Sequence, residues 1–575
     1  MGVATRIVKD QGMASLVAQS IEKIRKREFT VVGPSVPDVD YANWIVKYEP
    51  GESVLAGQRA KASQFPYRPL LSVVIPVWNP PIELFAKTID SVSSQTYDNW
   101  ELCIADGNSN EKIKETIRTL VRGENRVRAE FLATNQGISR NSNAAIELAK
   151  GDFIALLDHD DLLAPNALFE IAAALNEGRE VDYIYSDMDH MTIQGRRTDP
   201  LFKPDWSPDM MLCNNYATHL SVVKSGLLKN IEGFRAETEG TQDWDLILRI
   251  SEHTDRILHI PKILYHWRQT QSSVSYAGLR AKPYAKKSEL LTLEQYLLRN
   301  QMHGTINQHV PGFPRVVWNV DPSTLVTLIL LDDGTLEELR RCTRSIFEKS
   351  SYENIETIIV TNKEAREDFD LGDQRVRVVH TSEPLDFPTA NNLGVARGRG
   401  EVLVFLDRRI EVLSSDWLQE LVGWCSQPKI GVVGPQLVSE GKIIHGGIVI
   451  GLPGFLFQGA PVRWRSPLGH TEWYRNCSAV SKYCLAVKRS LFQELGSFNE
   501  TLGALADVEL CLRARRMGYR TVHTPRAKLL FPLSQPELSQ VNVFRKYHEL
   551  VVGPDPYFNP NLSYSHTMPT LIVDH

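Results

Sequence analysis

Residues 153–161 read Phe153-Ile154-Ala155-Leu156-Leu157-Asp158-His159-Asp160-Asp161. The uninterrupted apolar run is typical of a short buried strand, and the acidic residues follow directly at its carboxyl end. In an open α/β sheet, ligands bind at this edge, and carboxylates there suit a hard cation that holds a phosphorylated ligand. The junction therefore predicts an α/β fold whose chemistry takes place at the end of this strand.

The pattern around this strand occurs a second time in the chain. Gly151, the apolar run and Asp158 are echoed by Gly400, an apolar run over 402–406 and Asp407. The two copies are roughly 250 to 265 residues apart, which is far beyond a solenoid period and indicates a duplicated domain. A second matching pair of strings is Asp243-Trp244-Asp245-Leu246-Ile247-Leu248-Arg249 and Asp507-Val508-Glu509-Leu510-Cys511-Leu512-Arg513.

The start of the first copy predicts a strand, a helix and a second strand in that order. We expect a strand over 71–75 that ends at Pro76, a helix over 82–94, and a strand over 101–105 that leads into Asp106. This order predicts a parallel βαβ unit. The whole chain then reads as α/β, with two tandem domains that have mostly parallel sheets and a helical N-terminal extension. The expected ranges are 1–68 for the extension, 69–310 for the first domain, 311–322 for a linker and 323–575 for the second domain.

Length and composition agree with two globular domains. The chain has 575 residues, of which 42% are hydrophobic and 23% charged, so each half can bury its own core. A formal net charge of -5 provides no global basic field and argues against nucleic acid as the main partner. The chain has 7 cysteines, an odd number with no Cys-x-x-Cys spacing, and we expect them to be reduced thiols.

The sequence shows no secretory signal and no apolar stretch long enough to cross a bilayer, so we expect a cytoplasmic protein. Residues 14–27 form an amphipathic helical pattern that ends in a basic cluster. Such a segment either touches anionic lipid on the inner face of the membrane or docks on its own protein, and both readings stay open.

The acidic cluster after residue 157 is the strongest candidate for a metal site. Asp158, Asp160 and Asp161 would repel one another unless a cation or a set of donors compensates their charge. A site for Mn²⁺ or Mg²⁺ is the favoured interpretation. The alternative is that Asp160 or Asp161 caps a helix that begins near Pro165.

Three other residues are candidates for the same chemistry. Asp106 ends a strand, where it could accept a hydrogen bond from a base or ribose, although Asp-Gly-Asn-Ser is equally good turn chemistry. Asp243 begins a helix whose dipole stabilises its anion, which suits a general base, although aspartate is also common at ordinary helix starts. His266 on its own could be a core or rim residue, and next to the predicted metal it becomes a candidate ligand, since Mn²⁺ tolerates imidazole better than Mg²⁺ does.

Taken together, these residues resemble family 2 glycosyltransferases with the GT-A fold. The longer strings over 41–65, 202–209 and 265–268 are similar to bacterial rhamnosyltransferase-like proteins that build surface polysaccharide. The motifs that carry the resemblance are Pro76-Val77-Trp78-Asn79, Asp106, Asn135-Gln136-Gly137-Ile138-Ser139-Arg140, Asp158-His159-Asp160, Gln242-Asp243 and His266.

The resemblance implies an inverting transfer of a sugar from a nucleotide-diphospho-sugar to an acceptor hydroxyl, such as that of a glycan or a lipid-linked glycan. It implies that Asp160 and His266 hold the metal and that Asp243 deprotonates the acceptor. Asp106 is followed by Gly107, where relatives often have a second acid, which puts nucleotide selectivity in doubt. The residues implied to contact the nucleotide-sugar are Pro76, Val77, Trp78, Asp106, Arg140, Asp158 and His159.

The second copy retains the frame and loses most of these groups. Thr361 stands for Asp106, Arg409 for Asp160, and Leu530 or Phe531 for His266, whereas Asp407 and Asp507 remain. We expect a degenerate, non-catalytic domain. A bifunctional enzyme, in which Arg408 and Arg409 neutralise a diphosphate without metal, is an alternative. So is a non-catalytic carbohydrate-binding or scaffold protein in which both copies have drifted.

Overall fold

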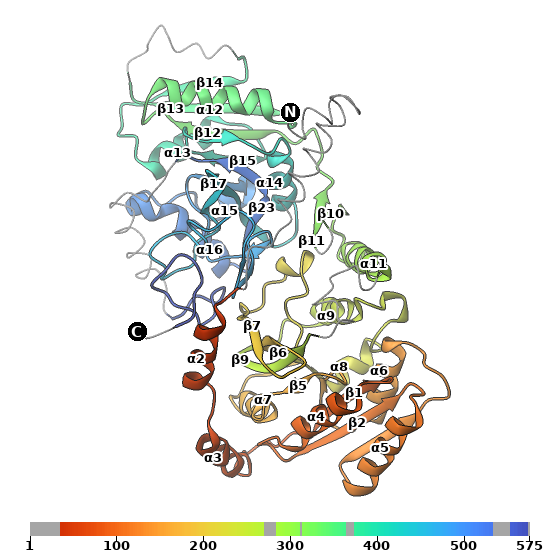
Figure 1. Cartoon of the computed structure of the whole chain (residues 1–575). Coiled ribbons are helices and arrows are strands. Elements are labelled where there is room, and N and C mark those ends of the chain that lie inside the picture. Colours follow the sequence, from red (N-terminus) through yellow and green to blue (C-terminus); the bar gives the residue numbers. More distant parts are fainter. Residues whose placement is uncertain (1–34, 270–282, 311–312, 364–372, 533–552, 573–575) are drawn as a thin grey trace, which may run out of the picture.

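The computed structural model describes residues 35–269, 283–310, 313–363, 373–532 and 553–572. It contains two α/β halves, with the N-terminal half below and the C-terminal half above in Figure 1. The predicted amphipathic segment over 14–27 lies outside the described residues. The described part of the N-terminal extension contains α2 (Asp38–Tyr48) and α3 (Glu52–Ala62).

The first sheet has the strand order β3-β2-β1-β4-β8-β6-β9-β5, and β7 pairs with β6. Its first four strands are parallel, whereas β8 runs antiparallel to both β4 and β6. The strands are β1 (Leu71–Val77), β2 (Trp100–Asp106), β3 (Val127–Phe131), β4 (Phe153–Leu156), β5 (Leu162–Leu163), β6 (Tyr183–Met191), β7 (Arg197–Leu201), β8 (Ser221–Lys224) and β9 (Ile257–Arg268). The helices are α4 (Ile82–Ser93), α5 (Glu111–Gly123), α6 (Ile138–Leu148), α7 (Ala167–Leu175), α8 (Ser225–Asn230) and α9 (Gln242–His253).

The second sheet repeats this topology strand for strand, in the order β14-β13-β12-β15-β22-β17-β23-β16. Its strands are β12 (Val326–Leu331), β13 (Ile355–Thr361), β14 (Val376–His380), β15 (Val402–Leu406), β16 (Glu411–Val412), β17 (Ile430–Ser439), β22 (Cys484–Lys488) and β23 (Arg520–Leu530), with β18 (Lys442–His445) and β21 (Arg475–Asn476) paired at its margins. Its helices are α12 (Leu336–Lys349), α13 (Phe387–Arg397), α14 (Trp417–Cys425), α15 (Arg489–Glu494) and α16 (Ala506–Arg516). The predicted fold class and duplication are confirmed.

A buried polar contact that joins three strands occurs in both sheets. In the first, the Ser72 hydroxyl donates to Glu101 (2.7 Å) and accepts from the Gly151 amide (2.9 Å). In the second, Thr327 and Glu356 make the same contacts with the Gly400 amide. A Cβ at Gly151 would lie 2.5 Å from the Leu70 carbonyl oxygen, so the close approach of the chain requires glycine here.

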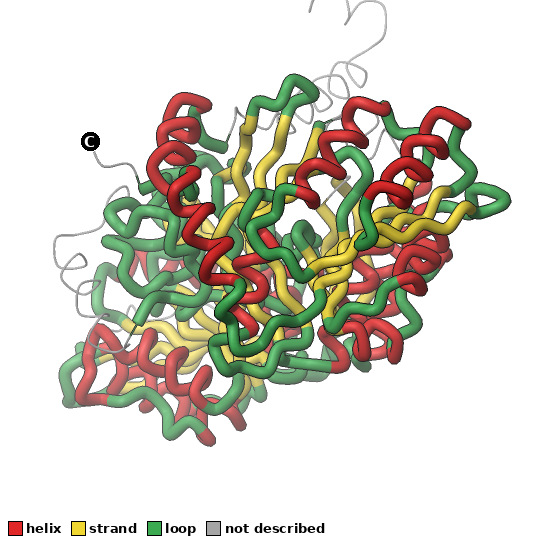
Figure 2. The backbone as a smooth tube through the Cα atoms, turned by 90° about the horizontal axis from the view of Figure 1, so that it is seen from below, coloured by secondary structure: helices red, strands yellow, loops and turns green. Residues whose placement is uncertain are grey.

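Helices cover both faces of the sheets, which appear as yellow strands between red helices in Figure 2. Strand β1 shows why its sequence is continuously apolar. Val73 and Ile75 pack into one core cluster, whereas Val74 packs into a second cluster with residues of α6 and α9. Strands buried on both faces need apolar residues at every position.

Two boundaries differ from the sequence-based expectation. Strand β1 does not end at Pro76 but continues to Val77. Proline has no amide hydrogen to donate, and Pro76 is tolerated in the strand because the pairing of β1 with β4 already stops at Val74. The expected linker over 311–322 contains β11 (Phe313–Trp318), which pairs antiparallel with β10 (Gly304–Val310) after α11 (Pro283–Arg299). Burial alternates at the end of β11, where Val316 and Trp318 are buried and Val317 between them is exposed, as in a strand with one covered face.

The two halves contact each other through buried polar and apolar groups. Arg520 of β23 donates to both carboxylate oxygens of Asp209 in the first half (2.6 and 2.9 Å), and the Asn476 amide donates to the same carboxylate (2.6 Å). One apolar cluster combines Tyr41 and Trp44 of α2 with Phe202 of the first half and Leu456 of the second. Helix α2 therefore lies in the contact between the halves, as Figure 1 also shows.

All seven cysteines are free and buried, in agreement with the expectation of reduced thiols. Within the part of the chain that the structure describes, no helix combines the length and the apolar character needed to cross a bilayer.

The contact between the halves generates a stability prediction. Asp209 is 3% exposed and its partner Arg520 24% exposed, so Asp209→Asn leaves a largely buried guanidinium without its counter-charge. We expect a loss of about 2–4 kcal/mol in the free energy of unfolding, measured by urea denaturation. Asp98→Asn is the control, because Asp98 pairs with Arg68 at the surface, where its side chain is 73% exposed. A surface ion pair contributes little to the free energy of unfolding. An equal loss of stability in the two variants would show that the buried pair contributes no more than the surface pair.

Candidate functional site

The predicted site lies where β1, β2 and β4 end at one edge of the first sheet. The Gly107 amide donates to the Val77 carbonyl (2.8 Å), which joins the end of β2 to that of β1. The His159 ring nitrogen Nδ1 lies 3.1 Å from the Pro76 carbonyl oxygen, which joins the loop after β4 to the same point. Trp78, at this edge, is 53% exposed and offers an aromatic surface.

Asp106 is buried at the end of β2, and both of its carboxylate oxygens accept from the Ser109 amide, at 3.2 and 3.1 Å. The turn contact that the sequence left open is therefore present. The role of Asp106 toward a nucleoside stays a prediction.

Arg140 is exposed in the first turn of α6, close to the same edge. A Cβ on Gly107 would lie 2.5 Å from the Asn141 side chain, so the end of β2 and the start of α6 are in contact. A Cβ on Gly137 would lie 2.2 Å from the Glu239 carboxylate, which precedes α9. The fold thus brings together the start of α6, which carries Arg140, and the segment that leads into α9 and Asp243.

The loop over 158–161 is held by side chains from two other elements. The Thr88 hydroxyl of α4 donates to the Asp161 carbonyl (2.8 Å). The Tyr265 hydroxyl and the Arg268 amide, both of β9, donate to the Asp161 carboxylate (2.6 and 2.7 Å). Burial, and then the charges of Asp160 and Asp158, raise the pKa of Asp161 well above its usual value. Negative charge is therefore crowded here, as the sequence predicts.

The alternative helix-capping role of Asp160 and Asp161 is wrong. Helix α7 begins at Ala167, and the residue at its N-cap position is Asn166. The chain instead stays extended after Asp161, because β5 pairs with β9 through Leu162 and His266. Asp161 consequently directs its carboxylate to β9.

Asp160 and His266 differ from Asp161 in what they contact. Among the described residues, the Asp160 carboxylate has no hydrogen bond or ion pair, although its backbone carbonyl accepts from Arg268 Nε (2.6 Å). His266 Nδ1 lies 2.7 Å from the Asp189 carboxylate, so Nε2 is the nitrogen that is left for a ligand. An unpaired carboxylate and an oriented imidazole fit a Mn²⁺ or Mg²⁺ ion that takes its remaining ligands from a diphosphate and water. No group of three or more His, Cys, Asp or Glu side chains arranged for a metal occurs in the described ranges.

Asp189 of β6 is a site residue that sequence reasoning missed. It is fully buried and also accepts from the Tyr41 hydroxyl (2.5 Å) and from Arg197 Nε. Burial by itself raises the pKa of Asp189, but the neighbouring His266 and Arg197 outweigh it and hold the pKa below the usual value. The sequence did contain a signal: Asp187 and Asp189 are spaced to fall on one face of a strand, and carboxylates buried in a strand require partners.

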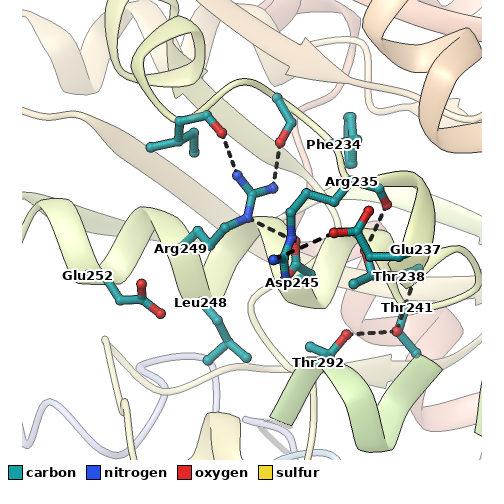
Figure 3. A network of polar contacts seen from close by, with 12 residues as sticks. Phe234, Arg235, Glu237, Thr238, Thr241, Asp245, Leu248, Arg249, Glu252 and Thr292 are labelled. Carbon is teal, nitrogen blue, oxygen red and sulfur yellow. Dashed lines mark hydrogen bonds and ion pairs between the residues drawn. The ribbon is translucent and has the colours of Figure 1, made fainter. Parts of the chain in front are cut away.

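Asp243 lies in the first turn of α9, where its carboxylate accepts from the Gln242 side chain (3.1 Å). Ion pairs fix this end of the helix (Figure 3). Asp245 pairs with both Arg235 and Arg249, and Arg249 Nη1 donates to the Ile231 carbonyl (2.6 Å). The predicted base therefore belongs to a rigidly held helix start.

At the same edge of the second half, charged side chains form ion pairs with one another. Arg409 makes a two-point ion pair with Asp407 (2.8 and 2.7 Å), and its guanidinium lies over the Phe531 ring. The Lys363 ammonium pairs with Asp332 (2.8 Å). Strand β16 pairs Glu411 with Leu530, as β5 pairs Leu162 with His266, so Leu530, and not Phe531, stands for His266.

Sequence comparisons place the chain among glycosyltransferases. The profile described as "Glycosyl transferase family 2" matches residues 72–216 and 334–496, which together make up more than half of the 575 residues and fall in both halves. The chain is 33% identical to the O-antigen biosynthesis protein RfbC of Myxococcus xanthus over 93% of its own length and 43% of that protein. It is 36% identical to the uncharacterized protein y4gI of Sinorhizobium fredii over 86% of its length and 58% of that protein. The chain thus spans about half the length of these relatives.

Weaker similarity extends to polysaccharide synthases and to a solved structure. The chondroitin synthase of Pasteurella multocida is 27% identical over 41% of this chain and 24% of that protein. The crystal structure of S. aureus TarS residues 1-349 aligns at a TM-score of 0.31 and 17% identity, and covers 40% of this chain and 72% of that one. The match of the family profile to both halves, on the repeated sheet topology, shows that the chain belongs to glycosyl transferase family 2.

Proposed function

We propose that the N-terminal half transfers a sugar from a nucleotide-diphospho-sugar to an acceptor hydroxyl during synthesis of a bacterial cell-surface glycan. The family assignment and the similarity to an O-antigen biosynthesis protein support glycosyl transfer in glycan biosynthesis. The acceptor in this proposal is a glycan or a lipid-linked glycan. Peripheral contact with the inner face of the membrane is part of the same proposal.

The observation that carries the proposal is the acidic loop at the end of β4. The loop places the carboxylates of Asp158, Asp160 and Asp161 together, and burial raises the pKa of Asp161. The corresponding loop of the second half balances Asp407 with Arg409. Three carboxyl groups gathered at the end of a buried strand suit a divalent cation, and this favours a working site over a drifted scaffold in the first half.

Asp160 and His266 would hold Mn²⁺ or Mg²⁺ in this site. When bound, the ion would supply positive charge against the negative charge that grows on the leaving diphosphate. Arg140 and Trp78 would contact the donor, and Asp158 and His159 would do so from the loop after β4. Asp106 would meet the nucleoside.

Asp243 would act as general base on the acceptor hydroxyl. Its position in the first turn of α9 favours the ionised carboxylate, because the helix dipole stabilises an anion there. Direct displacement by the activated hydroxyl breaks the bond between the sugar and the diphosphate, forms the new glycosidic bond and inverts the anomeric centre. No covalent sugar–enzyme intermediate belongs to this scheme.

The C-terminal half would be non-catalytic and would support the first half or bind acceptor. Arg409 and Leu530 stand where the first half has Asp160 and His266, and Arg409 is already paired with Asp407. A two-site enzyme is the competing proposal. It would require Arg409 to leave Asp407 for a donor diphosphate.

Replacing Asp160 tests the metal-binding role. We expect Asp160→Ala to abolish sugar transfer and to leave the thermal unfolding midpoint nearly unchanged, because the variant also relieves repulsion within the cluster. Transfer is measured with a panel of sugar nucleotides in the presence of Mn²⁺. Asp90→Ala, at an exposed position of α4, is the control and should retain activity. Full activity of Asp160→Ala would remove Asp160 from the site.

Asp243→Asn tests the base and the asymmetry between the halves together. The amide keeps the shape but accepts no proton, so turnover should fall on the order of 10²- to 10⁴-fold while donor affinity changes little. Asp507→Asn is the matched control, because Asp507 stands at the same place in α16 of the second half. It should leave turnover unchanged. Equal losses in the two variants would favour a two-site enzyme, and an Asp243→Asn enzyme with normal turnover would exclude Asp243 as the base.

A further inference from the structure

Strand β6 presents two buried aspartates to two histidines of β9. Asp187 Oδ1 lies 2.9 Å from His259 Nε2, and Asp189 Oδ1 lies 2.7 Å from His266 Nδ1. The strand register places Asp189 directly opposite His266. The two pairs are chemically alike, and only the second contains a residue of the proposed site.

The remaining partners of the two aspartates separate their roles. Asp187 Oδ2 accepts from the Asn559 amide of the second half (2.8 Å), so this pair belongs to the contact between the halves. Asp189 Oδ2 instead accepts from the Tyr41 hydroxyl of α2 and from Arg197 Nε. The pair that contains His266 is thus connected to the N-terminal extension.

These contacts determine which nitrogen of His266 carries the proton. Tyr41 and Arg197 both donate to Asp189, which identifies its carboxylate as an acceptor. His266 must therefore donate from Nδ1, and in the neutral imidazole Nε2 then keeps the lone pair that a metal requires. Asp189 is fully buried, and the hydrogen bonds from Tyr41 and Arg197 hold its carboxylate in the position that orients the ring.

Helix α2 completes the arrangement. Arg197 pairs with Glu49, directly after α2, as well as with Asp189, so the guanidinium sits between two carboxylates. Tyr41 is 1% exposed and packs in the apolar cluster that joins α2 to both halves. Tyr41 and Glu49 both precede residue 72, where the first family match begins.

We propose that Asp189 is a positioning residue that presents His266 Nε2 to a divalent cation, and that Tyr41 and Arg197 hold Asp189 in place for this task. The inference rests on the proposed function of His266 as a metal ligand. According to this proposal, α2 supports the metal site in addition to packing between the two halves. The N-terminal extension then contributes to metal affinity without touching the ion.

The test is the affinity of the full chain for Mn²⁺, measured from the electron paramagnetic resonance signal of free Mn²⁺ during titration. We expect Asp189→Asn to weaken binding about 10- to 100-fold, as loss of a carboxylate behind a metal-bound histidine commonly does. Tyr41→Phe, which keeps the ring and removes the hydroxyl that donates to Asp189 and accepts from Arg197 Nη2, should weaken it several-fold. Asp187→Asn is the matched control: it disrupts an equally buried pair on the same strand, and its Mn²⁺ affinity should stay within about twofold of the parent while its unfolding midpoint falls.

His266→Ala separates this inference from the function on which it rests. If His266→Ala binds Mn²⁺ as the parent does, the metal role of His266 fails and the inference falls with it. If His266→Ala loses binding but Asp189→Asn does not, only the positioning role is overturned. Equal loss of affinity in Asp187→Asn and Asp189→Asn would likewise overturn it, because the effect would then reflect general destabilisation. If Asp189→Asn does not fold, Tyr41→Phe decides alone, and unchanged affinity in that variant overturns the proposal.

Discussion

The geometry of the loop after β4, which carries the proposed site, depends on the contacts of the buried Asp161 carboxylate. This carboxylate accepts from the Tyr265 hydroxyl and the Arg268 amide, and so ties the loop after β4 to β9. Burial, and then the charges of Asp160 and Asp158, raise the pKa of Asp161, although the hydrogen bonds from Tyr265 and Arg268 act to lower it. Because the loop is fixed in this way, Asp160 is held at the sheet edge beside the strand that carries His266.

The second half has the same sheet topology without a buried carboxylate at the position of Asp161. There Ile410 and Leu529, both buried and apolar, occupy the places that Asp161 and Tyr265 occupy in the first half. Replacing a buried polar pair by well-packed apolar residues is often neutral or stabilising. The first half therefore keeps an electrostatic cost that its fold does not need, which is characteristic of a functional site.

Contacts that serve the fold alone are the ones that both halves share. Arg249 pairs with Asp245 and donates to backbone carbonyls that precede its helix, and Arg513 does the same with Glu509 and the Leu495 and Ser497 carbonyls. Asn143 and Asn392 each exchange two hydrogen bonds with a phenylalanine backbone. The two halves share these scaffold contacts, whereas the charged groups at the sheet edge differ between them.

The sequence by itself determined the α/β class, the duplication and the acidic edge of the first sheet. Apolar runs, glycines at close approaches and carboxylates at strand ends are local signals, and they also showed that Arg409 replaces Asp160. Local signals did not separate a helix-capping Asp161 from one bound to β9, since both place an aspartate after a strand. Only the tertiary structure decided this, and only it joined Tyr41, Asp189 and His266, because these residues are far apart in the sequence and meet through the pairing of β6 with β9 and the docking of α2. Which distant side chains become buried together, and which of them pair, depends on tertiary packing. The spacing of residues along the chain does not predict it.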